Sequence, residues 1–313
     1  MSDGPHFLLV GAAKSGTTAL YHALRAHPQV FMPDNKEPHF FAFPPGPLSF
    51  GGPRDHERHG RTITDPTAYA RLFAGRRADQ IAGEASTYYL YSPIAPARIR
   101  ESLPDVRLVA ILREPARRAF ANYLHLVRQG FETAATFEEG LAREPGRIRA
   151  GWDFFWRYRD MGFYHRQLTR YFEVFGRDRI LVTFHDDFQK DPARLVRAVY
   201  TFLGVDPSFT PDLSRRVNRS GVPKSRRLQQ LLATPPPPVR RLARRWLSAD
   251  RRGRLAEFVG RLNLSRPDLP ETTLARLRRD YEADIVALEQ LLGVDLSGWR
   301  HDTAAGAGRR AEA

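Results

Sequence analysis

Short apolar runs alternate with amphipathic stretches along most of the chain. The apolar runs predict buried β-strands at residues 7–10, 80–84, 107–112 and 179–184. Between and after them, apolar positions recur at the spacing of one helix face. This spacing predicts helices at residues 17–26, 93–103, from 115 onward, near 136–142, at 162–175 and at 192–203. Strands separated by helices are typical of an α/β fold with a largely parallel sheet.

The last third of the chain reads as helical. Residues 235–238 are four prolines that break the pattern, and residues 239–262 form a basic amphipathic segment. A final helix then carries an apolar stripe that we expect to be core, made of Leu274, Leu277, Tyr281, Ile285, Leu288 and Leu292. Residues 303–313 are small and polar, so we expect one domain at 1–302 and a disordered tail.

One stretch interrupts the alternation near the N-terminus. Residues 43–53 are rich in proline, glycine and phenylalanine, and a charged segment follows as far as residue 65. Neither part shows a sustained helix or strand period. We therefore expect a surface insertion here, within the domain.

Composition narrows the class of protein. The 313 residues are 42% hydrophobic with a mean hydropathy of −0.47, and no run approaches the length of a membrane-spanning helix. The first apolar run lacks a preceding basic region, so it is better used as a core strand than as a signal peptide. The chain has no cysteine, which excludes disulfides and thiolate metal sites and is consistent with a cytoplasmic protein.

The charge balance points to anionic partners. The formal net charge is +14 and the pI is about 10.5. Nucleic acid is one partner that such a charge suggests, but the arginines are spread along the chain without the signature of a DNA- or RNA-binding module. A second interpretation is an anionic surface, such as a membrane, contacted through residues 239–262.

The turn after the first strand is the strongest chemical signal. Small residues at 11–16 lead into a helix N-terminus, where backbone N–H groups and the helix dipole favour an anion. Lys14 adds a cation, and hydroxyl donors and a glycine complete the turn: Ser15, Gly16, Thr17 and Thr18. The turn differs from the nucleotide-triphosphate loop, in which the lysine follows the last glycine. An ordinary strand-to-helix turn with a solvated lysine is the alternative.

Three motifs in a fixed order resemble one enzyme family. GAAKSGTTAL at 11–20 looks like the 5′-phosphosulfate loop of sulfotransferases that use 3′-phosphoadenosine 5′-phosphosulfate (PAPS). KEPHFF at 36–41 is similar to the segment that carries the base in the carbohydrate and heparan-sulfate branch. The segment 107–125 resembles the 3′-phosphate strand and helix, and the likeness continues through 162–206. The resemblance implies a P-loop-like three-layer α/β/α fold with a helical C-terminal part.

The same resemblance implies a PAPS site with two anion clamps. The first is the loop containing Lys14, which would stabilise the leaving phosphate. The second is Arg113, directly after a predicted strand, for the 3′-phosphate. The family usually has a serine at the position of Ala121, so either the affinity for the nucleotide is lower or Asn122 or Arg117 substitutes for it. A polar loop containing Arg219 is a further candidate for contact with the nucleotide. No metal is implied.

The resemblance also implies an acid–base role for the second motif. Glu37 matches the base that takes a proton from the acceptor hydroxyl or amine, and His39 is the alternative base. Phe40 and Phe41 are better assigned to the core than to catalysis. Related enzymes often have a lysine at the position of Ala85, and Ser86, Tyr88 or Lys36 could compensate for it.

The sequence therefore predicts PAPS-dependent transfer of a sulfuryl group, with 3′-phosphoadenosine 5′-phosphate (PAP) as product. The expected acceptor is a carbohydrate or another hydroxylated small molecule, with no nucleic acid. Two alternatives stay open. One is a P-loop kinase for a nucleotide or small molecule, although Arg113 followed by Glu114 is not the acidic pattern that organises Mg²⁺. The other is a protein that binds an anionic surface.

Overall fold

The computed structural model describes residues 4–213, 222–223, 264–265 and 267–301. Three expectations lie outside these residues. They concern the basic amphipathic segment at 239–262, the tail at 303–313 and the position of Arg219.

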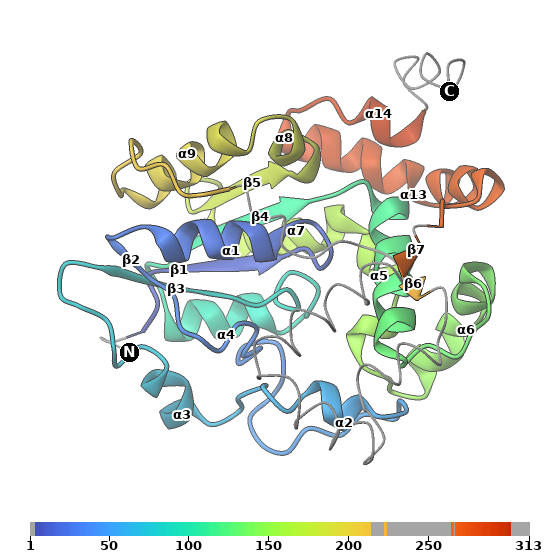
Figure 1. The fold of residues 1–313 in the computed structure, drawn as a ribbon, viewed down its shortest axis with the longest axis horizontal. Coiled ribbons are helices and arrows are strands. Elements are labelled where there is room, and N and C mark those ends of the chain that lie inside the picture. Colours follow the sequence, from blue (N-terminus) through green and yellow to red (C-terminus); the bar gives the residue numbers. More distant parts are fainter. Residues whose placement is uncertain (1–3, 214–221, 224–263, 266, 302–313) are drawn as a thin grey trace, which may run out of the picture.

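A five-stranded parallel sheet forms the centre of the molecule, in the order β2-β3-β1-β4-β5. Parallel strands place their carboxyl ends at one edge, and the arrows of β1, β4 and β5 point the same way in Figure 1. The strands are β1 (Phe7–Gly11), β2 (Val30–Phe31), β3 (Ile81–Ala85), β4 (Arg107–Leu112) and β5 (Ile180–Phe184). A short antiparallel pair joins β6 (Val222–Pro223) and β7 (Leu264–Ser265).

Helices of very different length connect and flank the strands. The first half contains α1 (Thr17–Ala26), α2 (Asp55–Arg58), α3 (Pro66–Arg71), α4 (Ala95–Ser102), α5 (Pro115–Gln129) and α6 (Phe137–Arg149). The second half contains α7 (Tyr164–Phe175), α8 (His185–Lys190), α9 (Pro192–Leu203), α13 (Glu271–Leu292) and α14 (Ser297–Arg300). Two short 3₁₀ turns lie at Phe154–Trp156 and Asp160–Gly162.

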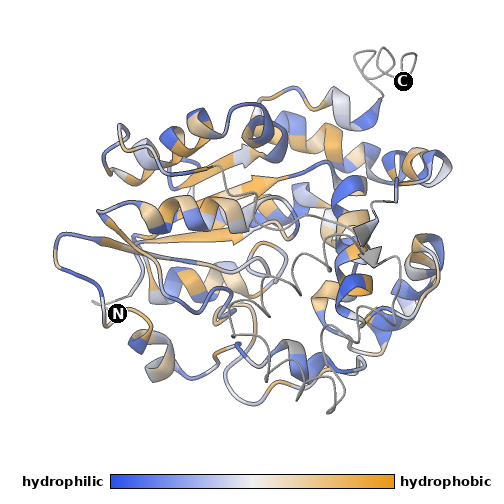
Figure 2. Ribbon diagram, in the orientation of Figure 1, coloured by the Kyte–Doolittle hydropathy of each residue, from blue (hydrophilic) through white to orange (hydrophobic). Residues whose placement is uncertain are grey.

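The sheet separates two apolar cores. Successive side chains of β1 point to opposite faces, so Leu8 and Val10 pack in one core while Phe7 and Leu9 pack in the other. Helices α1, α8 and α9 cover the face of Phe7 and Leu9, whereas α4, α5, α7 and α13 contribute to the opposite core. Burial on both faces explains why β1, and β4 from Leu108 onward, are apolar (Figure 2).

The predicted α/β fold with a largely parallel sheet is confirmed. The strand expected at 107–112 and the helix expected at 192–203 have the predicted bounds. The strand expected at 80–84 starts and ends one residue later, and the helix expected near 136–142 continues to Arg149 although Pro145 lies inside it. Sequence analysis missed β2 and α3 because each is too short to show a period.

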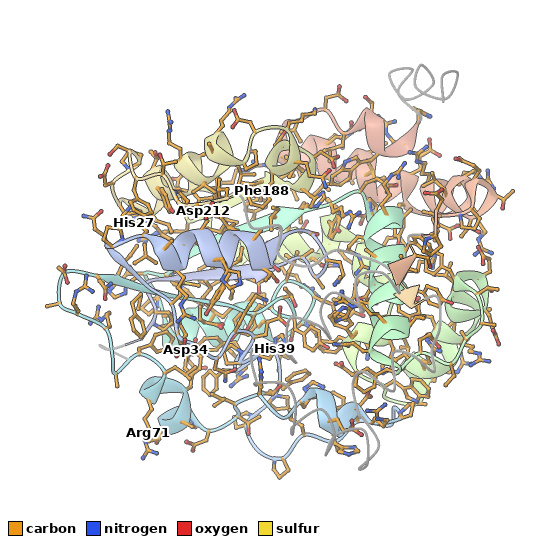
Figure 3. The ribbon with its side chains drawn as sticks, viewed as in Figure 1. His27, Asp34, His39, Arg71, Phe188 and Asp212 are labelled. Atoms are coloured by element: carbon orange, nitrogen blue, oxygen red, sulfur yellow. The ribbon has the colours of Figure 1, made fainter. Side chains whose placement is uncertain are left out.

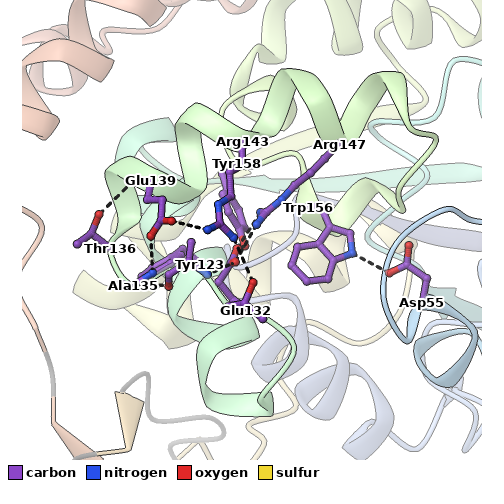
Figure 4. Close-up of polar contacts among 12 residues, drawn as sticks. Asp55, Tyr123, Glu132, Ala135, Thr136, Glu139, Arg143, Arg147, Trp156 and Tyr158 are labelled. Atoms are coloured by element: carbon purple, nitrogen blue, oxygen red, sulfur yellow. Dashed lines mark hydrogen bonds and ion pairs between the residues drawn. The ribbon is translucent and has the colours of Figure 1, made fainter.

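The expected surface insertion is exposed at its tip but anchored at both ends. Phe43 packs in the core, and Asp55 is buried. The Asp55 carboxylate accepts hydrogen bonds from the Gly52 and Asp153 backbone N–H groups at 3.1 and 3.0 Å. It also accepts one of 2.7 Å from Trp156 Nε1 (Figure 4). The segment is therefore part of the fold around the 3₁₀ turn that carries Trp156.

Helix α6 is attached to the same region by a buried ion pair. Arg147 donates two hydrogen bonds of 2.8 Å to Glu132, which also accepts a hydrogen bond from the Tyr158 hydroxyl (Figure 4). The Arg147 guanidinium lies over the Trp156 ring at 4.8 Å. The aromatic run at 152–158 therefore serves mainly as core, since Trp156 and Tyr158 are buried.

The C-terminal helix α13 packs along α7 and α5. Its predicted stripe is confirmed as core, since Leu274, Leu277, Tyr281, Ile285 and Leu288 are buried and Leu292 is partly buried. Tyr281 also donates a hydrogen bond of 2.7 Å to the Arg159 carbonyl. Across the part of the chain that the structure describes, no helix is both long and apolar enough to cross a membrane.

Candidate active site

The loop between β1 and α1 has the geometry of an anion cradle. Gly16 precedes α1 with φ 102°, a left-handed conformation that side chains rarely adopt. A Cβ at this position would lie 3.4 Å from His185 and from Phe188. Among the described residues, no side chain caps the N-terminus of α1. The Ala19 N–H donates a hydrogen bond of 3.0 Å to the Gly16 carbonyl oxygen, so the N–H groups of Thr17 and Thr18 are the ones that can face an anion. Thr17 is buried and Thr18 is half-buried beside this opening.

Lys14 lies in this loop under the electrostatic influence of other positive charges. Its backbone is left-handed, with φ 67°. Burial lowers the pKa of Lys14 to about 8, with Arg128, Arg113 and Lys36 acting in the same direction and Glu37 opposing them. The cations around Lys14 thus repel one another. An anion placed among them would relieve this repulsion, which is the property expected of a phosphosulfate site.

Arg113 joins the loop to the neighbouring strand. It follows the last residue of β4, and its Nη1 donates a hydrogen bond of 3.1 Å to the Lys14 carbonyl oxygen. The Tyr164 hydroxyl donates a hydrogen bond of 3.0 Å to the Arg113 carbonyl oxygen. Burial lowers the pKa of Arg113. The two predicted anion clamps therefore touch, because β1 and β4 are neighbours in the sheet.

The segment that carries Glu37 and His39 is an unusual turn. It follows β2 in the chain and lies beside the carboxyl end of β3. Both residues have a left-handed backbone, with φ 66° and 52°. The Glu37 backbone N–H donates a hydrogen bond of 2.9 Å to the Ala85 carbonyl oxygen. The His39 backbone N–H donates one of 2.9 Å to Ser86 Oγ. Strand β3 therefore holds the turn near the anion loop.

The Glu37 carboxylate faces the lysines. Its side chain is 33% exposed, and Oε1 accepts a hydrogen bond from Lys36 Nζ. Burial works to raise the pKa of Glu37, but the charges of Lys36, His39 and Lys14 prevail and lower it to about 2. Glu37 is therefore an ionised carboxylate at neutral pH that contacts Lys36 and acts electrostatically on Lys14.

His39 is packed more deeply than Glu37. Its side chain is 9% exposed and its Nε2 lies 3.9 Å from Glu37 Oε2. The ring stacks on Tyr88 with centroids 4.1 Å apart, and Figure 3 shows it in the loop that precedes α2. Burial lowers the pKa of His39 to about 4, against the opposing effect of Glu37 and Asp153. His39 is therefore a neutral, aromatic-packed histidine at neutral pH.

A buried polar layer supports the ring of Tyr88. The Tyr88 hydroxyl donates a hydrogen bond of 2.5 Å to Asp153 Oδ2, and Asp153 Oδ1 lies 3.4 Å from His59 Nε2. Tyr88 is one candidate to replace the lysine that the family often has at the position of Ala85. Its hydroxyl is committed to Asp153 instead. Sequence analysis missed this layer because Asp153 and His59 are distant in sequence from the motifs.

The structure gives less direct support to the other residues predicted to bind PAPS. Asn122 is buried, and its Nδ2 donates a hydrogen bond of 2.6 Å to the Phe155 carbonyl oxygen. Ala121 is buried beside it, while the Arg117 side chain is largely exposed. A role for Asn122 or Arg117 at the 3′-phosphate stays a prediction. Ser15 is buried within the loop.

The structure adds one cation to those found in the motifs. Arg128, in the last turn of α5, is the largest charged contribution to the lowered pKa of Lys14. The helical spacing of the sequence could have placed Arg128 on this helix. The sequence alone does not show that Arg128 approaches the loop that contains Lys14. Across the described ranges, no cluster of three or more His, Asp or Glu side chains is arranged to hold a metal ion.

Residues 5–211 match the model of the sulfotransferase family. The chain belongs to this family. It is similar to a sulfotransferase from Alicyclobacillus acidocaldarius, with 34% identity and a TM-score of 0.75 over 95% of this chain and 99% of that one. This likeness confirms that the α/β sheet with flanking helices is the P-loop-like sulfotransferase fold.

Curated relatives of this sulfotransferase act on heparan sulfate, as their names state. Human heparan sulfate glucosamine 3-O-sulfotransferase 6 is 31% identical over 206 residues, which are 64% of this chain and 52% of that protein. Human bifunctional heparan sulfate N-deacetylase/N-sulfotransferase 3 is 28% identical over 66% of this chain and 23% of its own length. The chain thus matches about half or less of the curated relatives named here.

Proposed function

We propose that this sulfotransferase transfers the sulfuryl group of PAPS to a hydroxyl or amine of a small-molecule or carbohydrate acceptor. The observation that carries the proposal is the meeting of three groups at the carboxyl edge of the sheet. Lys14 and Arg113 are joined by a hydrogen bond, and the Glu37 carboxylate acts electrostatically on Lys14. A cation pair beside an ionised base suits in-line transfer from the phosphate oxygen to the acceptor oxygen or nitrogen.

Each of these residues would have a separate role in the transfer. Glu37 accepts the proton of the acceptor as the new bond from acceptor oxygen or nitrogen to sulfur forms. The bond from sulfur to the phosphate oxygen breaks, and its electron pair leaves with PAP. Lys14 and the N–H groups at the start of α1 stabilise the charge on that phosphate oxygen. Arg113 holds the 3′-phosphate, and PAPS itself supplies the activated sulfuryl group.

Glu37 is the better base of the two candidates. Both Glu37 and His39 are deprotonated at neutral pH, so the pKa values do not decide between them. Exposure favours Glu37, since its side chain is 33% exposed and the His39 side chain is 9% exposed. His39 is stacked on Tyr88 and suits a packing role beside the base.

Lys36 is the best replacement for the lysine that the family often has at Ala85. Ser86 and Tyr88, the other candidates, use their hydroxyls in buried hydrogen bonds. Lys36 is cationic and its Nζ contacts the Glu37 carboxylate. We assign it to the bridge between the sulfuryl group and the base.

The acceptor class follows from the base and from the relatives. A carboxylate base matches the motif of the carbohydrate branch, and the relatives named above are heparan sulfate enzymes. A panel of carbohydrates and hydroxylated metabolites with sulfur-labelled PAPS would identify the acceptor. Label that enters no acceptor of either kind would contradict this assignment.

Ligand-induced stabilisation tests the reaction class. PAP should raise the melting temperature without Mg²⁺, because the clamps are arginine, lysine and backbone N–H groups. A P-loop kinase would instead respond to Mg·ATP. Stabilisation by Mg·ATP with no response to PAP would replace the proposal with the kinase alternative.

A further inference from the structure

Glu84 is a buried carboxyl group that the mechanism above does not use. It lies near the end of β3, opposite Leu8 of β1, and is 0% exposed. Its neighbours are hydroxyl groups: Ser86 and Tyr89 lie beside the carboxyl, and Tyr69 faces the same cluster. A buried carboxyl needs such partners, because an unpaired one would destabilise the fold.

Glu84 is connected to the turn that carries the base. Ser86 Oγ donates a hydrogen bond of 3.0 Å to Glu84 Oε2 and accepts one of 2.9 Å from the His39 backbone N–H. The residue between them, Ala85, accepts the hydrogen bond from the Glu37 backbone N–H at 2.9 Å. Ala85 and Ser86 therefore hold the two ends of the turn, and Glu84 is connected to it through Ser86.

The turn requires this support. Glu37 and His39 have left-handed backbones, which only a well-determined environment maintains in residues other than glycine. Ser86 is completely buried, so its hydroxyl is not available to an acceptor. Its two hydrogen bonds instead orient it, one as donor to Glu84 and one as acceptor from His39.

The charge state of Glu84 suits a supporting role. Burial raises the pKa of Glu84 to about 8, with Tyr89 and Ser86 opposing it, while Glu37 raises it further and Lys36 lowers it. Glu84 is thus neutral at neutral pH and places no second negative charge beside Glu37. A neutral carboxyl group both accepts and donates a hydrogen bond, which a glutamine can also do.

We propose that Glu84 is a positioning residue that holds the Glu37–His39 turn through Ser86 and so directs the base toward Lys14. The inference rests on the proposed function for its kinetic consequence. Its structural part, the link from Glu84 through Ser86 to the turn, stands separately and can be tested without turnover.

Two variants and one control test the link. Ser86→Ala removes the hydroxyl between Glu84 and His39, so kcat should fall about tenfold while the Kd for PAP stays unchanged. Glu84→Gln keeps the hydrogen bonds in neutral form, so kcat at neutral pH should remain within about twofold of the original. Tyr69→Phe removes a hydroxyl from the same buried cluster but not from the link, and should leave kcat unchanged.

The φ angles of the turn are a second measurement, and a general packing role of Ser86 would not change them. A crystal structure of Ser86→Ala should show φ of Glu37 and His39 moved out of the left-handed region. Unchanged φ angles in that variant, or unchanged kcat, would overturn the inference. Equal losses of kcat in Ser86→Ala and Tyr69→Phe would also overturn it. Failure of the proposed function would appear differently, as absence of PAP binding and of transfer in the unsubstituted protein.

Discussion

Three candidate residues of the site share a rare backbone conformation. Lys14, Glu37 and His39 have φ angles of 67°, 66° and 52°. Such conformations cost on the order of 1–3 kcal/mol each in residues other than glycine, and they concentrate at functional sites. Glycine would remove the strain at each position but would also remove the side chain. The retained strain is therefore consistent with a requirement for the ammonium, carboxylate and imidazole groups.

The first prediction concerns the cation beside the bond that breaks. Lys14→Ala should lower kcat about a hundredfold, because one group that stabilises a developing charge contributes roughly 3 kcal/mol. Steady-state kinetics with saturating PAPS measure this effect. Lys190→Ala, at an exposed lysine that ends α8, is the matched control and should be neutral. A Lys14→Ala enzyme within threefold of the original would refute the assignment.

The second prediction is the pH dependence of PAPS capture. With a pKa of about 8, Lys14 loses its proton as the pH rises through this value in the free enzyme. The kcat/KM for PAPS should therefore fall above about pH 8, since this ratio reports groups of the free enzyme. The fall should persist in Glu84→Gln, which removes the other group with a pKa near 8. A flat profile to pH 9.5 would show that Lys14 does not bind PAPS.

At the scale of elements, the carboxyl end of β4 supplies the third prediction. Arg113→Ala should weaken PAP binding by roughly 2–3 kcal/mol, the range for a hydrogen bond to a charged group. Calorimetric titration with PAP measures this loss. Ala121→Ser restores the hydroxyl usual in the family and should tighten PAP binding or leave it unchanged. Normal PAP affinity in Arg113→Ala would place the 3′-phosphate site elsewhere.

Strand β3 supplies the fourth prediction, a pH effect on stability. The pKa of Glu84 is raised to about 8 in the folded protein, above its ordinary value in the unfolded chain. The folded state then holds a proton that the unfolded state releases, so stability falls from about pH 4.5 to about 8 by up to ~1.4 kcal/mol per pH unit. Glu84→Gln removes this contribution.

Denaturant titrations of both proteins across that pH range provide the measurement for Glu84. The stability difference in favour of Glu84→Gln should grow from about pH 4.5 and level off above about pH 8. Parallel pH curves for the two proteins would show that Glu84 does not titrate differently on folding.

Much of the element order could be predicted, because apolar runs and helical spacing are local signals. The sequence pattern located β4 and α9 to the residue. It ended α6 too early, since Pro145 and Gly146 resemble a stop signal that tertiary packing overrides. The motifs located Lys14, Glu37 and Arg113, but the buried layer of Asp153 and the link through Glu84 depend on contacts between distant segments. Burial of a polar group has no local signature.

For the whole molecule, the net charge is +14, and several of its cations act together at the candidate site. Arg128, Arg113 and Lys36 all act electrostatically on Lys14, in the loop that follows β1. Such a cluster attracts anionic ligands over a distance set by ionic strength. The proposed contact of residues 239–262 with an anionic membrane surface, like the cytoplasmic location, stays a prediction.

In the proposed mechanism, Glu37 activates the acceptor for sulfuryl transfer from PAPS. Its most direct test is the rate of label transfer from sulfur-labelled PAPS in Glu37→Gln and His39→Ala, with PAP affinity measured in parallel. We expect Glu37→Gln to lower kcat by roughly two to four orders of magnitude, the range for a general base, at unchanged PAP affinity. His39→Ala should lose much less. Full activity in Glu37→Gln together with an inactive His39→Ala would contradict the account and move the base to His39.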